Sequence, residues 1–170
     1  MKQGIRLGFI GSSDYHELLT GGLLRIQDTV RGINHQHMQA RCGLAAVRAP
    51  ELRRGEIFDA LQARRTYATS GIRAYLDVRV NGHPMGTEFV LSAEDDPRTV
   101  EVAAAAPEPM VAVELIRNGE VIADLADGTW RVETTCEDAT VLDGTAFYYV
   151  RITTERQDFA WSSPVWVDLE

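Results

Sequence analysis

The pattern of apolar and polar positions changes near residue 71 of this 170-residue chain. From Ile72 onward, apolar residues alternate with polar ones, which is typical of half-buried strands. Turn-forming residues separate the alternating runs, and we expect strands over residues 74–80, 87–91, 99–105, 111–117, 120–125, 129–135, 146–153 and 160–167. Seven or eight short strands of this kind predict an antiparallel β-sandwich over residues 72–170.

Turn residues refine this prediction at three points. Asn118-Gly119 separates residues 113–117 from residues 120–123, so we expect these two runs to form a hairpin. Asn81-Gly82 ends the first alternating run in the same way. The sequence Ser162-Ser163-Pro164 interrupts the last run, because proline has no N–H to donate to a strand ladder.

The first part of the chain has a different pattern. Residues 5–11 are mostly apolar and predict a short buried strand, and residues 43–47 predict a second. Residues 17–41 are irregular and read as a long loop. Residues 51–65 predict a helix, with Leu52, Ile57 and Leu61 on one stripe and Arg64-Arg65 at the C-terminal end of its dipole. The change of period divides the chain into residues 1–71 and 72–170.

Charge follows the same division. Residues 1–70 carry ten Lys and Arg against six Asp and Glu, whereas residues 72–170 carry seven against nineteen. The acidic part would repel nucleic-acid phosphates, and the arginines of the basic part form no dense patch. We therefore expect no nucleic-acid partner. Solvated faces and contacts between the two parts explain the asymmetry.

Membrane and targeting signals are not visible. No apolar run reaches 18 residues, so we expect no membrane span. The first residues carry one lysine but no long apolar stretch, so no signal peptide is visible. The cytoplasm is the default location, with a leader further upstream left as the alternative.

The strongest chemical signal is the pair Asp14 and His16, directly after the first apolar run. Side chains two residues apart on a strand point to the same side, so both could contact one ion. A carboxylate beside an imidazole suits zinc, manganese or iron. The ordinary alternative is an Asp in a turn followed by a loop histidine. Two ligands are also fewer than the three or more of a catalytic site.

A family resemblance strengthens the metal interpretation. Gly-Phe-Ile-Gly-Ser-Ser-Asp-x-His over residues 8–16, Gly-Leu-Ala-Ala-Val-Arg-Ala over residues 43–49 and Arg-Arg-Thr-Tyr-Ala-Thr-Ser-Gly over residues 64–71 resemble the end of a polymerase-and-histidinol-phosphatase (PHP) superfamily domain. Residues 81–86, 114–119, 148–151 and 160–164 look like the β-rich tail of PHP-related metallohydrolases. The resemblance covers nearly the whole chain in order.

This resemblance implies a fold and an activity. PHP proteins are distorted β/α barrels that hold two or three metal ions and hydrolyse phosphoesters or related esters, and Asp14 and His16 match their last metal-binding motif. The chain would then be α+β: a short strand-loop-strand-helix remnant of a PHP-type barrel followed by the antiparallel β-sandwich. Its partner would be the missing N-terminal barrel part. Alone, the chain would bind a divalent metal weakly and be inactive.

Other polar residues leave alternatives open. His35 and His37 have the spacing of a metal-binding His-x-His, but they follow Asp14 and His16 in a polar loop, where solvated histidines are the favoured interpretation. A substrate anion could be bound by Arg64, Arg65 and Tyr67. The same three residues could instead neutralise the helix dipole and pack at a junction.

Two functions of another class compete with the hydrolase. The aromatic residues of the predicted strands could stack on a sugar, although alternating strands more often bury them: Phe147, Tyr148, Trp161 and Trp166. The strands could also recognise a protein partner. Finally, the chain could stabilise or oligomerise a larger enzyme, and a homo-oligomer is left open.

Overall fold

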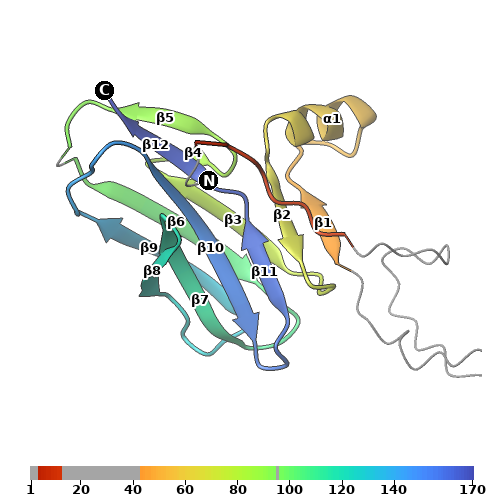
Figure 1. Cartoon of the computed structure of the whole chain (residues 1–170). Coiled ribbons are helices and arrows are strands. Elements are labelled where there is room, and N and C mark those ends of the chain that lie inside the picture. The colour runs from red at the N-terminus through yellow and green to blue at the C-terminus, as the bar shows by residue number, and fades with distance from the viewer. Residues whose placement is uncertain (1–3, 13–42, 95) are drawn as a thin grey trace, which may run out of the picture.

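A computed structural model describes residues 4–12, 43–94 and 96–170, which contain twelve strands and one short helix (Figure 1). The elements are β1 (Leu44–Val47), α1 (Arg54–Gln62), β2 (Thr66–Thr69), β3 (Tyr75–Val80), β4 (His83–Pro84), β5 (Glu88–Leu91), β6 (Arg98–Ala105), β7 (Met110–Arg117), β8 (Glu120–Asp124), β9 (Arg131–Asp138), β10 (Ala146–Thr154), β11 (Phe159–Ser162) and β12 (Val165–Leu169). Within these ranges, no helix is long and apolar enough to cross a membrane.

The strands form two sheets. The larger sheet has eight strands in the order β1-β2-β11-β10-β12-β5, with β7 on the other edge of β10 and β8 beyond β7. The smaller sheet has the order β4-β3-β6-β9. All strand pairs are antiparallel except β12 and β5, which are parallel. In Figure 1, β7, β10 and β11 form one layer, and β3, β6 and β9 form the layer behind it.

The hydrophobic core lies between the two sheets. It is built by alternate residues whose side chains point inward and are fully buried, among them Leu76, Val78 and Val80 of β3, Val100 and Val102 of β6, and Tyr148, Val150 and Ile152 of β10. Polar residues occupy many of the positions between them. The period-two pattern therefore selects the face that each strand buries, and removal of this apolar surface from water drives the packing.

Two tight turns have the predicted form. Asn118 and Gly119 both have positive φ, at 53° and 89°, and they join β7 to β8. Asn81 and Gly82, at 49° and 76°, join β3 to β4 in the same way. Positive φ at both central residues is the geometry of a type I′ hairpin turn, in which Asn and Gly are favoured.

The predicted fold class is wrong. An α+β chain with a PHP-type barrel remnant requires parallel strands alternating with helices, whereas β1 and β2 pair antiparallel and β2 continues onto β11. The first part of the chain therefore extends the larger sheet. A purely antiparallel sandwich is also wrong, because β12 and β5 are parallel. The division at residue 71 stays a prediction.

The misread elements have a physical explanation. The sequence pattern predicts no strand over residues 66–69, directly after the predicted helix, but their β-branched and small side chains suit a buried strand, and all four are buried. The helix α1 has nine residues, of which only Ala60 is buried. Leu52, before the helix, is 94% exposed. Residues 5–11 belong to no strand of the described part.

A buried network of charged and polar side chains connects the two sheets at one end. Arg98 is fully buried; its Nε donates to the Tyr148 hydroxyl at 3.1 Å, and its other nitrogens donate to the carbonyls of Asp96 and Thr140. Asp138 accepts from the Tyr148 hydroxyl at 2.7 Å and lies 3.3 Å from Arg98. Arg117 adds a second cation at 2.7 Å. The network links β6, β7, β9 and β10.

Replacing Arg98 tests the energetic role of this network. Arg98→Met keeps the side-chain volume but leaves the Asp138 carboxylate buried with one cation fewer, so we expect the free energy of unfolding to fall by about 3–5 kcal/mol. Arg131→Ala is the control, since Arg131 pairs with Glu133 on the exposed surface and should change stability by less than about 0.5 kcal/mol. Urea unfolding followed by circular dichroism measures both. Equal effects would contradict the assignment.

The same network predicts a dependence of stability on pH. Burial alone raises the pKa of Asp138, but hydrogen bonds from Thr140, Tyr148 and Arg117 outweigh it and hold the pKa well below its usual value. A depressed folded-state pKa stabilises the protein above the unfolded value of about 3.9, and this contribution is lost as the pH falls below it. In Asp138→Asn, the free energy of unfolding should therefore decrease less steeply between about pH 4 and pH 2 than in the wild type.

The exposed Asp143 supplies the control for this measurement. Asp143→Asn should follow the wild-type pH dependence. A steeper acid loss in Asp138→Asn than in the wild type would contradict the prediction.

Candidate functional site

The predicted metal ligands Asp14 and His16 lie outside the described residues, and so do His35 and His37. Their ligation stays a prediction. Within residues 4–12, 43–94 and 96–170, no group of three or more His, Cys, Asp or Glu side chains could hold a metal ion. The described residues therefore bear on the site through the segment that leads to Asp14, namely residues 4–12.

Ion pairs hold the start of this segment on the outer face of the larger sheet. Arg6 donates from Nη1 to Glu88 at 2.5 Å and from Nη2 to Asp168 at 2.6 Å. The Thr145 hydroxyl also donates to Asp168, at 2.7 Å. The hydrogen bond from Arg6 is the main reason why the pKa of Asp168 lies below its usual value. Arg6 therefore connects the segment to the parallel strands β5 and β12.

The middle of the segment is held at the break between β11 and β12. The Phe9 amide donates to the Ser163 hydroxyl at 2.8 Å, and that hydroxyl lies 3.1 Å from the Thr66 hydroxyl. The Phe9 ring meets Tyr149 edge to face, with ring centroids 5.6 Å apart. The predicted interruption at Ser163 thus supplies the side chain that fixes the segment.

Two glycines let the segment approach the sheet closely. A Cβ at Gly8 would lie 2.9 Å from the Arg64 Cβ, and a Cβ at Gly11 would lie 2.4 Å from the carbonyl oxygen of Leu44 in β1. The second distance is far below any normal contact and involves backbone, which cannot move aside easily. The sequence Gly-Phe-Ile-Gly therefore fits this path closely.

Arg64, one of the three predicted anion contacts, is engaged within the protein. Its backbone is left-handed, with φ of 56°, and directs the side chain back toward the sheet. Its Nε donates to the Gly86 carbonyl at 2.9 Å, Nη2 to Glu88 at 2.6 Å, and Nη1 to the Arg6 carbonyl at 3.3 Å. The guanidinium also covers the ring of Trp166, 4.8 Å from its centroid.

The other two predicted anion contacts have different surroundings from Arg64. Tyr67 lies in the core between the sheets and donates its hydroxyl to the Ala74 carbonyl at 2.8 Å, and burial raises its pKa. Arg65 is half-buried, and its Nε is buried with no hydrogen-bond partner in the described part of the chain. Substrate binding by Arg64, Arg65 and Tyr67 stays a prediction.

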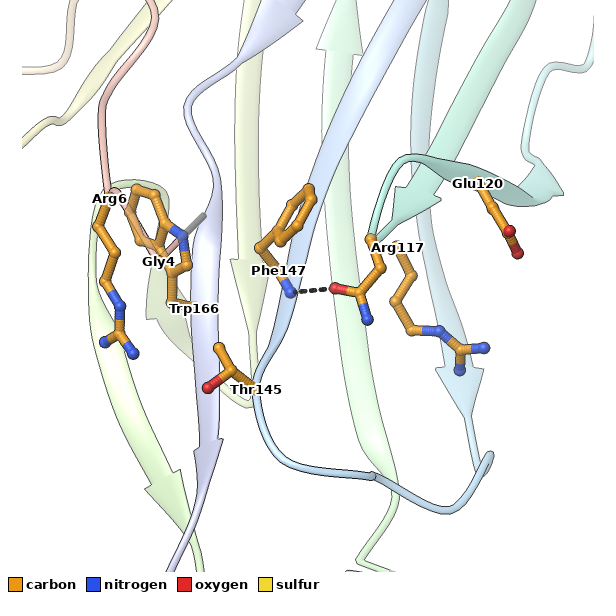
Figure 2. Close-up of a pocket in the computed structure, with 8 residues that line it drawn as sticks. Gly4, Arg6, Arg117, Glu120, Thr145, Phe147 and Trp166 are labelled. Carbon is orange, nitrogen blue, oxygen red and sulfur yellow. Dashed lines mark hydrogen bonds between the residues drawn. The ribbon is translucent and has the colours of Figure 1, made fainter. Parts of the chain in front are cut away.

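A surface pocket of about 510 Å³ lies beside the start of the segment (Figure 2). Its lining combines aromatic side chains with polar ones: Gly4, Arg6, Arg117, Asn118, Glu120, Thr145, Phe147 and Trp166. The two arginines lie on opposite sides of it in Figure 2. Both already pair with carboxylates, Arg6 with Asp168 and Arg117 with Asp138. The lining offers aromatic surface and hydrogen-bonding groups to a ligand.

Sequence reasoning singled out two lining residues and missed the rest. Phe147 and Trp166 were candidates for sugar stacking, but they are 7% and 2% exposed, and Tyr148 is fully buried. These three aromatic residues pack within the protein, whereas Trp161 is half-buried. No local sequence pattern indicated Arg6 and Arg117. Their carboxylate partners are distant in the sequence and become neighbours only in the folded chain.

Proteins of similar sequence are longer than this chain. An uncharacterized protein of Chlamydia pneumoniae is 30% identical over 190 residues, and one of Chlamydia muridarum is 30% identical over 185 residues. Each match covers 99% of this chain but 28% of the relative. The chain thus spans little more than a quarter of the length of these curated relatives.

Comparison with solved structures gives a weaker likeness. The crystal structure of an engineered protein matches 56% of this chain and 20% of its own, with 21% identity and a TM-score of 0.34. A family model described as protein of unknown function, DUF3604, matches residues 4–120. Since this match covers more than half of the sequence, the chain belongs to the DUF3604 family.

Proposed function

We propose that the chain is one part of a longer metal-dependent hydrolase that acts on phosphoester or related ester bonds. In this proposal Asp14 and His16 provide two ligands for a divalent zinc, manganese or iron ion. The resemblance of residues 8–16 to the last metal-binding motif of PHP proteins supports it. So does the length of the relatives, which leaves room for the other ligands outside this chain.

The anchoring of residues 4–12 is the observation that carries the proposal. Arg6 and Phe9 are bonded to side chains of the larger sheet, and Gly11 touches β1. The backbone is therefore held as far as the residues just before Asp14 in the sequence. Catalytic groups function only when their supporting residues fix them closely, and such anchoring suits that role.

Asp14 and His16 are suitable types of metal ligand, but two ligands are too few for a complete site. Aspartate and imidazole are ligands for zinc, manganese and iron, whereas the described residues add no cluster that would complete the site. A bound divalent ion would supply Lewis acidity and a water of lowered pKa. The remaining ligands would come from the rest of the longer protein, and the present chain would hold and orient Asp14 and His16.

Ligand substitutions in the longer protein test the proposal. Asp14→Ala and His16→Ala should each reduce bound metal and the turnover of p-nitrophenyl phosphate esters by about tenfold or more, as removal of ligands or their supports commonly does. Asp59→Ala, which removes an exposed carboxylate from α1, should leave both unchanged. The amount of bound metal per protein is measured by mass spectrometry of the purified proteins.

The isolated 170-residue chain provides the complementary test. It should show no hydrolysis, and Asp14→Ala should leave its melting temperature unchanged because no bound metal contributes to stability. Metal-dependent turnover by the isolated chain, abolished by His16→Ala, would contradict the need for further ligands. Full activity of the longer protein with both residues replaced would contradict the site itself.

Substitution of Gly11 tests the anchoring. Gly11→Ala places a methyl group against the Leu44 carbonyl, so residues 4–12 should detach more often, and trypsin should cleave after Arg6 about tenfold faster. Gly55→Ala is the matched control, because a Cβ at Gly55 meets no atom within 4 Å. Cleavage is followed by mass spectrometry. Equal rates in the two variants would contradict a closely fitted segment.

A further inference from the structure

Residues 4–12 have one anchored side and one exposed apolar side. Ile5, Leu7 and Ile10 are 53%, 63% and 61% exposed, and we call these three residues the apolar strip. Arg6 and Phe9, between them, are half-buried against the larger sheet. The sheet therefore holds the segment so that its apolar side chains face away from the rest of the described chain.

The backbone of this segment is also largely unpaired. Two hydrogen bonds involve it in the described ranges: the Phe9 amide donates to Ser163, and the Arg6 carbonyl accepts from Arg64. The backbone groups of Ile5 and Leu7 have no partner among the described residues. Unpaired backbone groups on an apolar segment form a template for another strand.

The helix next to the segment adds further exposed apolar side chains. Phe58 and Leu61 of α1 are 58% and 39% exposed. The chain leaves α1 through Arg64, whose side chain packs against Gly8 of the segment. In Figure 1 the segment, in red, runs from β12 toward β1, with α1 at one end of β2. Apolar groups of this kind on neighbouring elements mark a contact surface.

We propose that the apolar strip is a docking surface for the remainder of the longer protein, which adds an extended strand against residues 5–10. This inference rests on the part of the proposed function that places the chain in a longer polypeptide. The relatives support that occupant, since most of their length lies outside the match. The family match begins at Gly4, so the strip belongs to the shared family region.

Hydrogen exchange of the backbone amides tests this pairing. The longer protein and the 170-residue chain are compared by mass spectrometry at peptides that cover residues 5–10. We expect these amides to exchange about a hundredfold more slowly in the longer protein, because a paired strand must open before exchange. Peptides from the β7–β8 hairpin should exchange equally in both proteins, which controls for global stability.

Paired substitutions identify the side chains involved. Ile5→Ser with Leu7→Ser in the longer protein should remove most of the protection of residues 5–10. The matched control is Val111→Ser with Val121→Ser, since these valines are 49% and 50% exposed on β7 and β8. The control should keep the protection. In the isolated chain, neither pair should change the melting temperature by more than about 2 °C, because surface substitutions cost little.

Three outcomes would overturn the proposal. Equal exchange of residues 5–10 in both proteins would show that no partner covers the segment. Protection in the isolated chain that rises with concentration, together with a dimer in sedimentation, would identify a second copy as the occupant. A native product of 18.9 kDa in an immunoblot of the source organism would show that no longer polypeptide exists.

The readout is independent of metal and turnover. Unchanged metal binding and turnover in Asp14→Ala and His16→Ala, with intact protection of residues 5–10, would overturn the hydrolase proposal and leave the docking surface standing. Metal-dependent turnover without protection would do the reverse.

Discussion

The pairing of β10 on both of its edges is the constraint on which the rest of the structure depends. β7 follows one edge along nearly its whole length, while β12 and β11 share the other edge, pairing with residues 146–148 and 151–153 respectively. The chain must therefore break between β11 and β12. Ser163 and Pro164 occupy that break, where proline sacrifices no ladder hydrogen bond. The Ser163 hydroxyl becomes available to a second segment, and β11 offers its free edge to β2.

As a result of this arrangement, the two faces of the larger sheet have different roles. The inner face packs on β3, β6 and β9 and makes the core. On the outer face, Trp166, Arg64 and residues 4–12 form a second layer in which Glu88 and Asp168 pair with the arginines. These ion pairs are partly exposed, and such pairs contribute little stability each. These ion pairs mainly fix the position of residues 4–12, because they require specific partners and directions that apolar contacts do not.

The proposed hydrolase and the proposed docking surface use opposite sides of that one segment. Its inner side is fixed by Arg6, Gly8 and Phe9, which makes the route toward Asp14 reproducible. Its outer side presents Ile5 and Leu7 without partners among the described residues. A β-structure that holds a strand for the remainder of a longer protein would couple the position of the metal ligands to the assembly of the whole protein.

The sequence by itself determined the local features of this protein. Period-two alternation located most strands, and the Asn-Gly pairs located both tight turns, because burial of one face and positive φ are properties of a few adjacent residues. Of the candidate site, the sequence could name Asp14 and His16 as a ligand motif but could not supply their surroundings. The tertiary structure alone decided that residues 66–69 are a strand, since β-branched residues suit either a strand or a helix exit until β11 pairs with them. It also decided that Arg6, Arg64 and Arg98 serve as internal anchors, because each cation depends on groups that are distant in the chain and become neighbours only when the sheets close.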